Sequence, residues 1–447
     1  MCGRSWRAGI RRHHSVLSGL SLGTLLLALS FSAAYGRSGV HPRTTRISVS
    51  SAGSQGTGPS GPSSISANGR FVAFDSNASN LVGGDTNGHE DIFVRDRKTG
   101  KTTRVSLSSS GAQGDGDSYG PSISADGRFV AFTSAAANLV PGDANVKNDA
   151  FVHDRKTGKT RLVSVNSSGV QGTGNSFPDS ISANGRLVAF TSDAGNLVAN
   201  DNNGVLDVFV HDRKSGKTKR VSVSSAGVEG TSDSYDSSIS TDGRFVAFKS
   251  DATNMVAHDT NLAGDVFIHD RKNGKTKRVS VNSLGEPGNG DSYGASISAG
   301  GRFVAFGSNA TNLVAHDTNL AGDIFVRDRK SGKTRRVSVS SAGVEGNDLS
   351  DESMISAGGR FVAFQSDATN LVGHDQNIEP DVFVRDLQTG KTKCISVNSA
   401  GVEGNGESEL PSVSADGRFV AFGSLATNLA GIDTNVVEDV FLRGPLR

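Results

Sequence analysis

Three oxygen-bearing residues in the pattern Asp-x-Asn-x-x-x-Asp occur seven times in the sequence, each copy 58 residues after the previous one. Carboxylate and amide oxygens at positions i, i+2 and i+6, with mostly small residues between them, resemble part of a calcium-binding loop. These residues are therefore candidate calcium ligands, and calcium is the one candidate cofactor. The residues are Asp85, Asn87, Asp91, Asp143, Asn145, Asp149, Asp201, Asn203, Asp207, Asp259, Asn261, Asp265, Asp317, Asn319, Asp323, Asp375, Asn377, Asp381, Asp433, Asn435 and Asp439.

A second interpretation of the same motif needs no metal. The position that supplies the next ligand of a calcium loop is not kept, and no regular bidentate glutamate follows it. Asp and Asn side chains also close Asx-turns by accepting hydrogen bonds from nearby backbone N–H groups. The motif therefore predicts either calcium sites or turns that need no ion. The variable position holds His89, Lys147, Val205, Ala263, Ala321, Glu379 and Val437.

Four aromatic residues share another position of the 58-residue spacing, in four consecutive copies. Aromatic side chains at one place in neighbouring repeats are able to stack on a sugar or to cap a peptide, which makes them candidates for binding a partner. The alternative is that they fill gaps between repeats. The residues are Tyr119, Phe177, Tyr235 and Tyr293.

Histidine and cysteine offer weaker candidates for chemistry. His258, His316 and His374 precede the Asp-Asn motif in three consecutive copies, and we interpret them as exposed loop residues rather than metal ligands. Cys394 is expected to be a surface substitution rather than a catalytic nucleophile, because other repeats hold arginine there. No catalytic residue is predicted, so the chain is expected not to be an enzyme. The equivalent arginines are Arg104, Arg220, Arg278 and Arg336.

One recurring stretch, residues 121–132, identifies the elements that must position these residues. Its glycine recurs seven times at intervals of 58 residues without slippage, and a repeat of this length rich in β-forming residues indicates a propeller. We predict an all-β fold, a seven-bladed β-propeller of four-stranded antiparallel blades made by seven 58-residue repeats at residues 44–447. The glycines are Gly69, Gly127, Gly185, Gly243, Gly301, Gly359 and Gly417.

Each repeat contains four predicted strands, which in the second copy are residues 122–124, 128–133, 150–153 and 161–165. Asp126-Gly127 is a hairpin turn signal between the first two. Twenty of the 22 Phe residues fall in three columns that begin at Phe71, Phe74 and Phe93. One aromatic side chain per repeat at a fixed strand position is typical of packing between blades.

The two ends of the repeat region predict how the ring closes. The seventh copy stops at Gly444-Pro445 before a fourth strand, whereas residues 46–49 stand in the register of a fourth strand ahead of the first copy. The N-terminal strand should therefore complete blade seven and leave no open edge.

The first 36 residues differ from the repeats. Arginines precede a mostly apolar run at residues 16–31, and small residues follow, which is the pattern of a secretory signal peptide. We predict a signal peptide at residues 1–36, a linker at 37–43 and no transmembrane span after cleavage, and therefore an extracytoplasmic protein, secreted or periplasmic. The formal net charge of +1 argues against a nucleic-acid partner.

The core of the repeat resembles the TolB-type, or PD40, class of WD40-like propeller repeats, whose pattern is close to Pro-x-Trp-Ser-Pro-Asp-Gly-x-x-Ile-Ala-Phe. The resemblance implies a propeller that serves as a binding scaffold, an enzyme accessory domain or a secretion partner. Ile123 and Ala125 replace the Trp and the second Pro, seven units differ from the six of TolB, and the α/β domain of TolB is absent. The matching residues are Pro121, Ser124, Asp126, Gly127, Ala131 and Phe132, followed by Asp154 and Thr157-Gly158-Lys159.

These observations favour a non-enzymatic binding or scaffolding module that holds a protein or glycan partner on the face formed by its long loops. A metal-dependent carbohydrate-active enzyme and a calcium-loaded structural envelope protein remain alternatives. Basic hairpins between the third and fourth strands either protect sheet edges or associate weakly with an anionic envelope surface. They span residues 97–101, 155–159, 213–217, 271–275 and 329–333.

Overall fold

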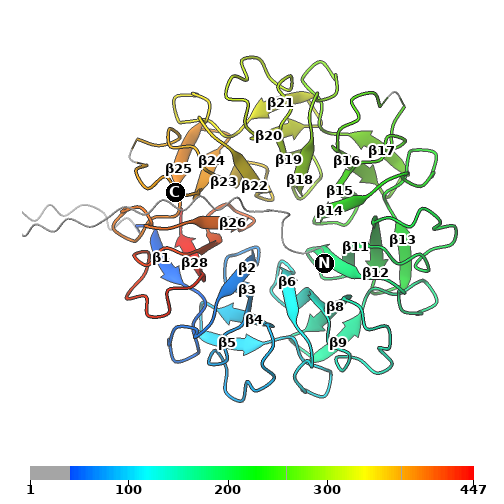
Figure 1. Ribbon diagram of the computed structural model, residues 1–447, viewed down its shortest axis with the longest axis vertical. Helices are drawn as coiled ribbons and strands as arrows, with labels where there is room; N and C mark the ends of the chain where they lie inside the picture. Colours follow the sequence, from blue (N-terminus) through cyan, green and yellow to red (C-terminus); the bar gives the residue numbers. More distant parts are fainter. Residues whose placement is uncertain (1–40, 258, 374, 447) are drawn as a thin grey trace, which may run out of the picture.

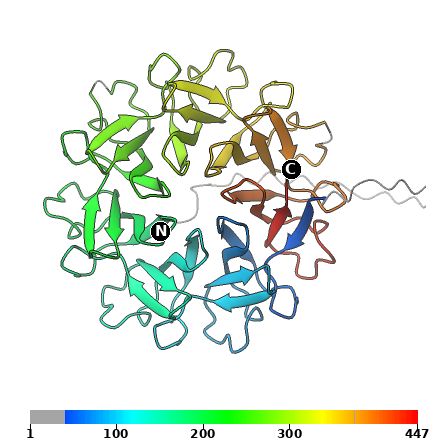
Figure 2. The ribbon, with the colours of Figure 1, turned by 180° about the vertical axis from the view of Figure 1, so that it is seen from behind.

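The computed structural model describes residues 41–257, 259–373 and 375–446, which form seven four-stranded antiparallel sheets around a central axis (Figures 1 and 2). The predicted seven-bladed β-propeller is confirmed. The predicted signal peptide lies outside the described residues. No helix among the described residues has the length and apolar character needed to cross a membrane.

The blades are numbered in chain order, and the first strand of each is the innermost. Blade 1 contains β2 (Ser60–Ile65), β3 (Phe71–Ser76), β4 (Asp91–Asp96) and β5 (Lys101–Arg104); blade 2 contains β6 (Ser118–Ile123), β7 (Phe129–Ser134), β8 (Asp149–Asp154) and β9 (Lys159–Leu162); blade 3 contains β10 (Ser176–Ile181), β11 (Leu187–Ser192), β12 (Asp207–Asp212) and β13 (Lys217–Arg220). Blade 4 contains β14 (Ser234–Ile239), β15 (Phe245–Ser250), β16 (Asp265–Asp270) and β17 (Lys275–Arg278); blade 5 contains β18 (Ser292–Ile297), β19 (Phe303–Ser308), β20 (Asp323–Asp328) and β21 (Lys333–Arg336). Blade 6 contains β22 (Ser350–Ile355), β23 (Phe361–Ser366), β24 (Asp381–Asp386) and β25 (Lys391–Cys394); blade 7 contains β26 (Ser408–Val413), β27 (Val420–Ser424), β28 (Asp439–Gly444) and β1 (Arg43–Arg46).

Ring closure occurs as the sequence predicts. Strand β1 pairs antiparallel with β28, with Arg43 opposite Gly444 and Arg46 opposite Phe441. The blue N-terminal strand and the red C-terminal strand therefore lie side by side in Figure 1. The pairing begins at Arg43, inside the predicted linker, and the N–H of Ile47 continues it by donating to the carbonyl of Val440 at 2.7 Å. Backbone hydrogen bonds thus remove the open edge between first and last blades.

The strand boundaries differ from the prediction at both edges of a blade. The first strand of blade 2 begins at Ser118, four residues earlier than expected, and contains a bulge between Tyr119 and Ser122. The fourth strand ends at Leu162, three residues earlier than expected. Beyond it the chain turns, and only an isolated bridge joins Val165 to Gln171. The innermost strand is longer than expected because its pairing with β7 begins at Ser118, before the residues 122–124 that predicted it.

The phenylalanine columns form the interfaces between blades. Phe132 and Phe151 stack with ring centroids 5.9 Å apart, and both are fully buried against Ala73 and Val94 of the preceding blade. The column that begins at Phe71 packs against the turn between the first two strands of the next blade, where the Phe71 ring lies next to Gly127. Each buried aromatic ring contributes on the order of 2 kcal/mol, so most of the core lies between blades.

The basic hairpins take part in the same interfaces. Arg155 lies 4.6 Å from the centre of the Phe71 ring in the preceding blade, and its Nη1 donates to the carbonyl of Gly127 at 2.5 Å. Arg97 and Arg213 contact Phe419 and Phe129 in the same way. These arginines therefore stabilise blade contacts, whereas the neighbouring lysines, such as Lys156, stay exposed.

Candidate functional sites on the long-loop face

The ring has two faces of different composition. We call the face formed by the turns between first and second and between third and fourth strands the hairpin face. The long-loop face is formed by the loops after the second strands and the linkers after the fourth strands. Hydrogen bonds tie loop and linker together, as when Asn87 Nδ2 donates to the carbonyl of Gly114 at 3.1 Å.

All seven motif asparagines make the contacts of a closed turn. Each Nδ2 donates to a linker glycine carbonyl at 2.8 to 3.1 Å, and each Oδ1 accepts the N–H of the residue two positions later. This is the geometry that the Asx-turn interpretation predicts. The backbone contacts both ends of each amide, so these turns close without any ion. The residues are Asn87, Asn145, Asn203, Asn261, Asn319, Asn377 and Asn435.

The two aspartates of each motif meet at a buried position. In blade 1, Asp91 is the first residue of β4 and is fully buried, and its Oδ1 accepts a 2.5 Å hydrogen bond from Ser106. Arg104, from β5, reaches between the two carboxylates, with Nη1 2.9 Å from Asp91 and Nη2 3.1 Å from Asp85. A single guanidinium therefore pairs with both aspartates.

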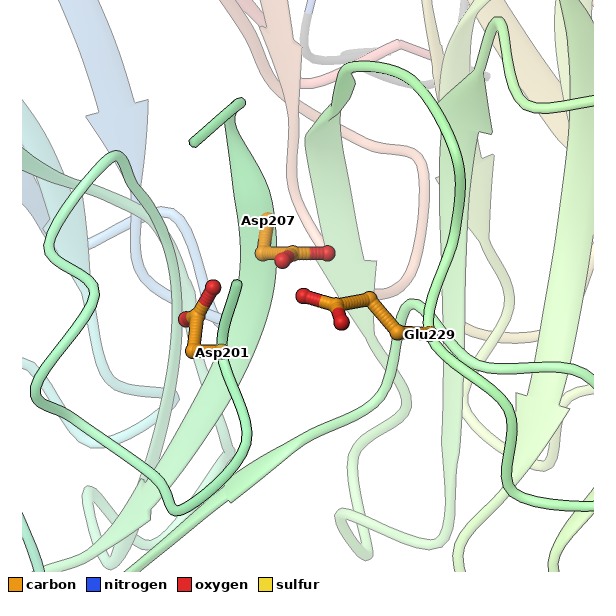
Figure 3. Close-up of side chains that lie close together, drawn as sticks. All are labelled: Asp201, Asp207 and Glu229. Atoms are coloured by element: carbon orange, nitrogen blue, oxygen red, sulfur yellow. The ribbon is translucent and has the colours of Figure 1, made fainter. Parts of the chain in front are cut away.

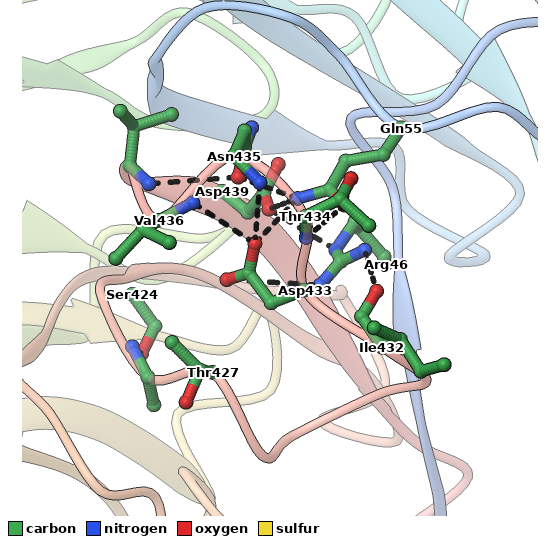
Figure 4. A network of polar contacts seen from close by, with 12 residues as sticks. Arg46, Gln55, Ser424, Thr427, Ile432, Asp433, Thr434, Asn435, Val436 and Asp439 are labelled. Atoms are coloured by element: carbon green, nitrogen blue, oxygen red, sulfur yellow. Dashed lines mark hydrogen bonds and ion pairs between the residues drawn. The ribbon is translucent and has the colours of Figure 1, made fainter.

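Five blades contain this arginine, and Figure 4 shows the version in blade 7. There Arg46 Nε lies 3.1 Å from Asp439, and Gln55 donates to Asp433 and Asp439 at 2.9 and 2.7 Å. The five side chains are only 5 to 9 % exposed. The expectation that this column lies on the surface is therefore wrong, because its members compensate buried charge. They are Arg46, Arg104, Arg220, Arg278 and Arg336.

In blade 2 a side-chain amide, instead of a guanidinium, contacts the two buried aspartates. Leu162 replaces the arginine, and Gln171 Nε2 donates to Asp143 and to Asp149 at 2.7 Å each. Burial nevertheless raises the pKa of Asp149 to about 6. An amide donor satisfies hydrogen bonds but supplies no full positive charge.

A third carboxylate joins the two aspartates in blades 3, 5 and 6. Figure 3 shows it in blade 3, where Asp201, Asp207 and Glu229 point toward one another. Arg220 Nη1 contacts all three, at 3.3 Å from Asp201, 2.9 Å from Asp207 and closer still to Glu229. We call this set, in any blade, the carboxylate cluster. The glutamates were missed in the sequence, although their common 58-residue column (Glu229, Glu345 and Glu403) was a usable signal.

Blade 6 has the three carboxylates but a cysteine in place of the arginine. Cys394 is partly buried against the core, so it is not the surface residue that the sequence predicted. Its Sγ lies 3.4 Å from Ser396 Oγ, and Ser396 donates in turn to Asp381 Oδ1. Burial and the neighbouring Glu403 raise the pKa of Asp381 to about 8. The cluster lacks the internal cation of blades 3 and 5.

The predicted aromatic residues lie on the innermost strands near the long-loop face. Phe177 is buried, at 8 % exposure, and fills space between blades. The Tyr235 hydroxyl lies 2.5 Å from Lys249 Nζ, and that cation also sits 4.7 Å from the Tyr235 ring. The Tyr293 hydroxyl donates to Asn309 at 3.4 Å, and Tyr119 is half-buried. The four occupy equivalent positions on the first strands of four consecutive blades, and gap filling explains Phe177.

The histidines separate into two groups. His153, His211 and His269 are buried in the third strands, where each Nδ1 lies 2.9 Å from a threonine Oγ1 of the fourth strand. Arg95 of blade 1 contacts Thr102 in the same way, so histidine and arginine occupy equivalent positions in different blades. His316 is exposed in its loop, as expected, whereas His258 and His374 lie outside the described residues.

Exposed aliphatic side chains form a feature that sequence reasoning missed. They occupy the turn just after the motif asparagine in five blades and are 74 to 95 % exposed. Each has a positive φ of 53 to 57°, a region that favours glycine. Blades 1 and 3 hold Gly88 and Gly204 there. We call these five residues the aliphatic ring: Val146, Leu262, Leu320, Ile378 and Val436.

No family model matches the sequence, and no curated protein matches it. Solved structures do match. An oligogalacturonate lyase in complex with manganese has 11 % identity and a TM-score of 0.53, with 91 % of each chain covered. The β-propeller domain of the trilobed protease from Pyrococcus furiosus has 11 % identity and a TM-score of 0.52, with coverage of 86 % of this chain and 95 % of that one.

This chain is a β-propeller. At these identities the likeness establishes the fold alone, and the solved neighbours include enzymes as well as TolB proteins. A putative TolB from Agrobacterium tumefaciens has 15 % identity and a TM-score of 0.40, with coverage of 77 % of this chain and 94 % of that one. The likeness to these structures therefore concerns the propeller fold, and the site residues must be interpreted from this propeller's own geometry.

Proposed function

We propose that this propeller is a non-enzymatic module that binds a protein partner outside the cytoplasm through its long-loop face. The observation that carries the proposal is the aliphatic ring, whose side chains are exposed on five of the seven blades. Large apolar side chains repeated at one place on a surface mark sites of protein association. The disc holds them in fixed positions, because each blade packs rigidly on the next.

The backbone conformation of the ring supports a functional role. Val146, Ile378 and Val436 are β-branched residues at positive φ, a combination that costs on the order of 1–3 kcal/mol each. Gly88 and Gly204 occupy the same turn in blades 1 and 3 at no such cost. Folding alone would favour glycine in all seven blades. The exposed and strained aliphatic residues are therefore explained by a role in binding and not by a role in folding.

The chemistry of the face favours a protein over a glycan. Sugar-binding surfaces use open aromatic faces, whereas the only tryptophan of the chain is Trp6, in the predicted signal peptide. Phe177 is buried and Tyr235 already contacts Lys249. Aliphatic groups instead complement the apolar pockets of a protein surface. The extracytoplasmic location rests on the predicted signal peptide, and fractionation of cells that express the full chain tests it.

A binding comparison tests the proposed surface. The full chain, a ring variant with the five aliphatic residues changed to Asn, and a control variant are immobilised and exposed to envelope proteins from the producing cell. Asn tolerates positive φ, so the ring variant should fold. The control changes four exposed linker valines, Val170, Val228, Val344 and Val402, to Asn.

We expect one partner to be captured by the full chain and the control, and at least tenfold less of it by the ring variant. Equal capture by all three proteins would contradict the proposal. Binding that disappears when the extract is treated with glycosidases, but survives in the ring variant, would replace the protein partner with a glycan.

A further inference from the structure

Blade 6 carries more uncompensated negative charge than blades 3 and 5. Blades 3 and 5 combine three carboxylates with a guanidinium, and Arg336 of blade 5 touches Asp317, Asp323 and Glu345. Blade 6 brings together three equivalent carboxylates, but its side chain at the arginine position is Cys394, which is too short to reach between them and carries no positive charge. Within the described residues, no ion pair reaches the three carboxylates of blade 6.

Buried oxygen atoms in this cluster lack partners. Asp381 is fully buried, yet among the described residues no hydrogen bond reaches its Oδ2, and the same holds for Asp375 Oδ1. Ligand atoms of Asp375, Asp381 and Glu403 lie within 4.8 Å of one another. Asp381 Oδ1 accepts a hydrogen bond from Ser396, whereas among the described residues its Oδ2 and Asp375 Oδ1 have only the neighbouring carboxyl groups close to them, and ionised carboxylates held this close repel one another. A positive charge between these oxygens, supplied by shared protons or by a bound cation, would relieve that repulsion.

We propose that blade 6 binds one calcium ion between Asp375, Asp381 and Glu403, in the place that the arginine guanidinium takes in blade 5. The sequence predicted seven equivalent candidate calcium sites, whereas this proposal has a single site. It adds Glu403 as a ligand and leaves out Asn377, whose amide contacts the backbone of Gly404 and Glu379. It does not depend on the protein partner proposed above.

The ligand set selects the class of ion. Calcium binds carboxylate oxygens at 2.3–2.6 Å, so oxygens up to about 4.8 Å apart are able to share one ion. Zinc prefers nitrogen and sulfur ligands at shorter distances. The one sulfur near the cluster, Cys394 Sγ, already lies 3.4 Å from Ser396 Oγ. The ligands that the described residues supply are three carboxylates, and such a set favours calcium.

Calcium titration of the full chain tests the site. Metal is first removed with a chelator, calcium chloride is then added, and binding is measured by calorimetry together with the melting temperature. We expect one calcium ion per chain and a higher melting temperature with calcium than without. Zero ions, or close to seven ions per chain, would overturn the proposal.

Two variants at Cys394 distinguish an effect of the added charge on calcium binding from a general loss of stability. Cys394→Arg installs the residue of five other blades and should abolish calcium binding while raising the melting temperature of the metal-free protein. Cys394→Ala is the matched control and should keep one calcium ion. Calcium binding that survives in Cys394→Arg, or is lost in Cys394→Ala, would contradict the proposal.

The converse change keeps the test informative if Cys394→Arg folds poorly. Arg336→Cys gives blade 5 the residue pattern of blade 6, with Asp317, Asp323 and Glu345 left without their cation. It should raise the stoichiometry from one to two calcium ions per chain. An unchanged stoichiometry in a folded Arg336→Cys variant would overturn the charge argument.

Discussion

The hairpin face and the long-loop face are built from the same repeat but use their polar residues differently. On the hairpin face, Arg128 donates two hydrogen bonds to Asp154, at 2.8 and 2.7 Å, and Arg155 stacks on Phe71 of the preceding blade. On the long-loop face, Asp381 of blade 6 keeps an unpartnered buried oxygen and Val146 is exposed at positive φ. The comparison teaches that arginines of the hairpin face stabilise contacts between blades, whereas the long-loop face holds strained turns and a buried acidic cluster.

Acid should weaken the hairpin half of the blades, and this is the largest effect we predict. Burial lowers the pKa of His153 and His211 to about 4, and that of His269 also falls. The unfolded chain binds protons on these histidines near pH 6.5 while the folded chain does not, so stability is lost as pH falls from 6.5 to 4. We expect a loss of roughly 2 kcal/mol for each of His153 and His211 by pH 4.5, and a further loss from His269 in the same direction.

The arginine found at this position in blade 1 provides the control for the acid effect. A triple variant His153→Arg, His211→Arg and His269→Arg should lose much less stability between pH 7 and pH 4.5, as measured by urea denaturation. Asp149 on the long-loop face has a raised pKa and changes stability in the opposite direction, but equally in both proteins. The same acid sensitivity in both proteins would show that these histidines are not the cause.

A matched pair of glycines distinguishes the packing of the two faces. Gly127, on the hairpin face, has a φ of 73°, and a Cβ there would lie 2.1 Å from the Phe71 ring. Gly142, on the long-loop face, has a φ of 82° and open space around it. We expect Gly127→Ala to cost about 3 kcal/mol and Gly142→Ala about 1 kcal/mol in the free energy of unfolding. Urea denaturation measures both costs, and equal values would contradict the predicted difference in packing between the two faces.

The stacked arginines should matter more than the lysines beside them. Arg155→Ala removes a contact with the Phe71 ring and a hydrogen bond to the Gly127 carbonyl, so we expect a loss of about 2 kcal/mol. Lys156→Ala changes an exposed side chain of the same hairpin and should stay within about 0.5 kcal/mol of the parent. Thermal melts of both variants check the order, and the reverse order would refute a structural role for Arg155.

Relief of backbone strain on the long-loop face should raise the free energy of unfolding, unlike the preceding changes, and it is the smallest effect that we predict. Val146→Gly should stabilise the protein by about 1 kcal/mol, because its φ of 53° suits glycine. Val170→Gly provides a comparison at an exposed valine that is not at positive φ, and it should destabilise slightly. A loss of stability in Val146→Gly would mean that its side chain supports the fold instead of serving binding.

The sequence by itself determined the blade and the number of blades. The 58-residue period, the Asp126-Gly127 turn and the phenylalanine columns are local signals, and they report strand pairing and apolar burial that each repeat must satisfy. Ring closure followed from the register of residues 46–49. These features were predictable because neighbouring strands along the chain are also neighbours in each blade.

Only the tertiary structure decided which charges meet. Arg104 and Asp85 are far apart in the sequence but are joined when β5 pairs with β4 and the preceding loop folds over both. The same packing showed that Cys394 borders a buried acidic cluster and that Val146 points into solvent at positive φ. Charge compensation and backbone strain depend on strand register and loop packing, which a repeated motif alone does not encode.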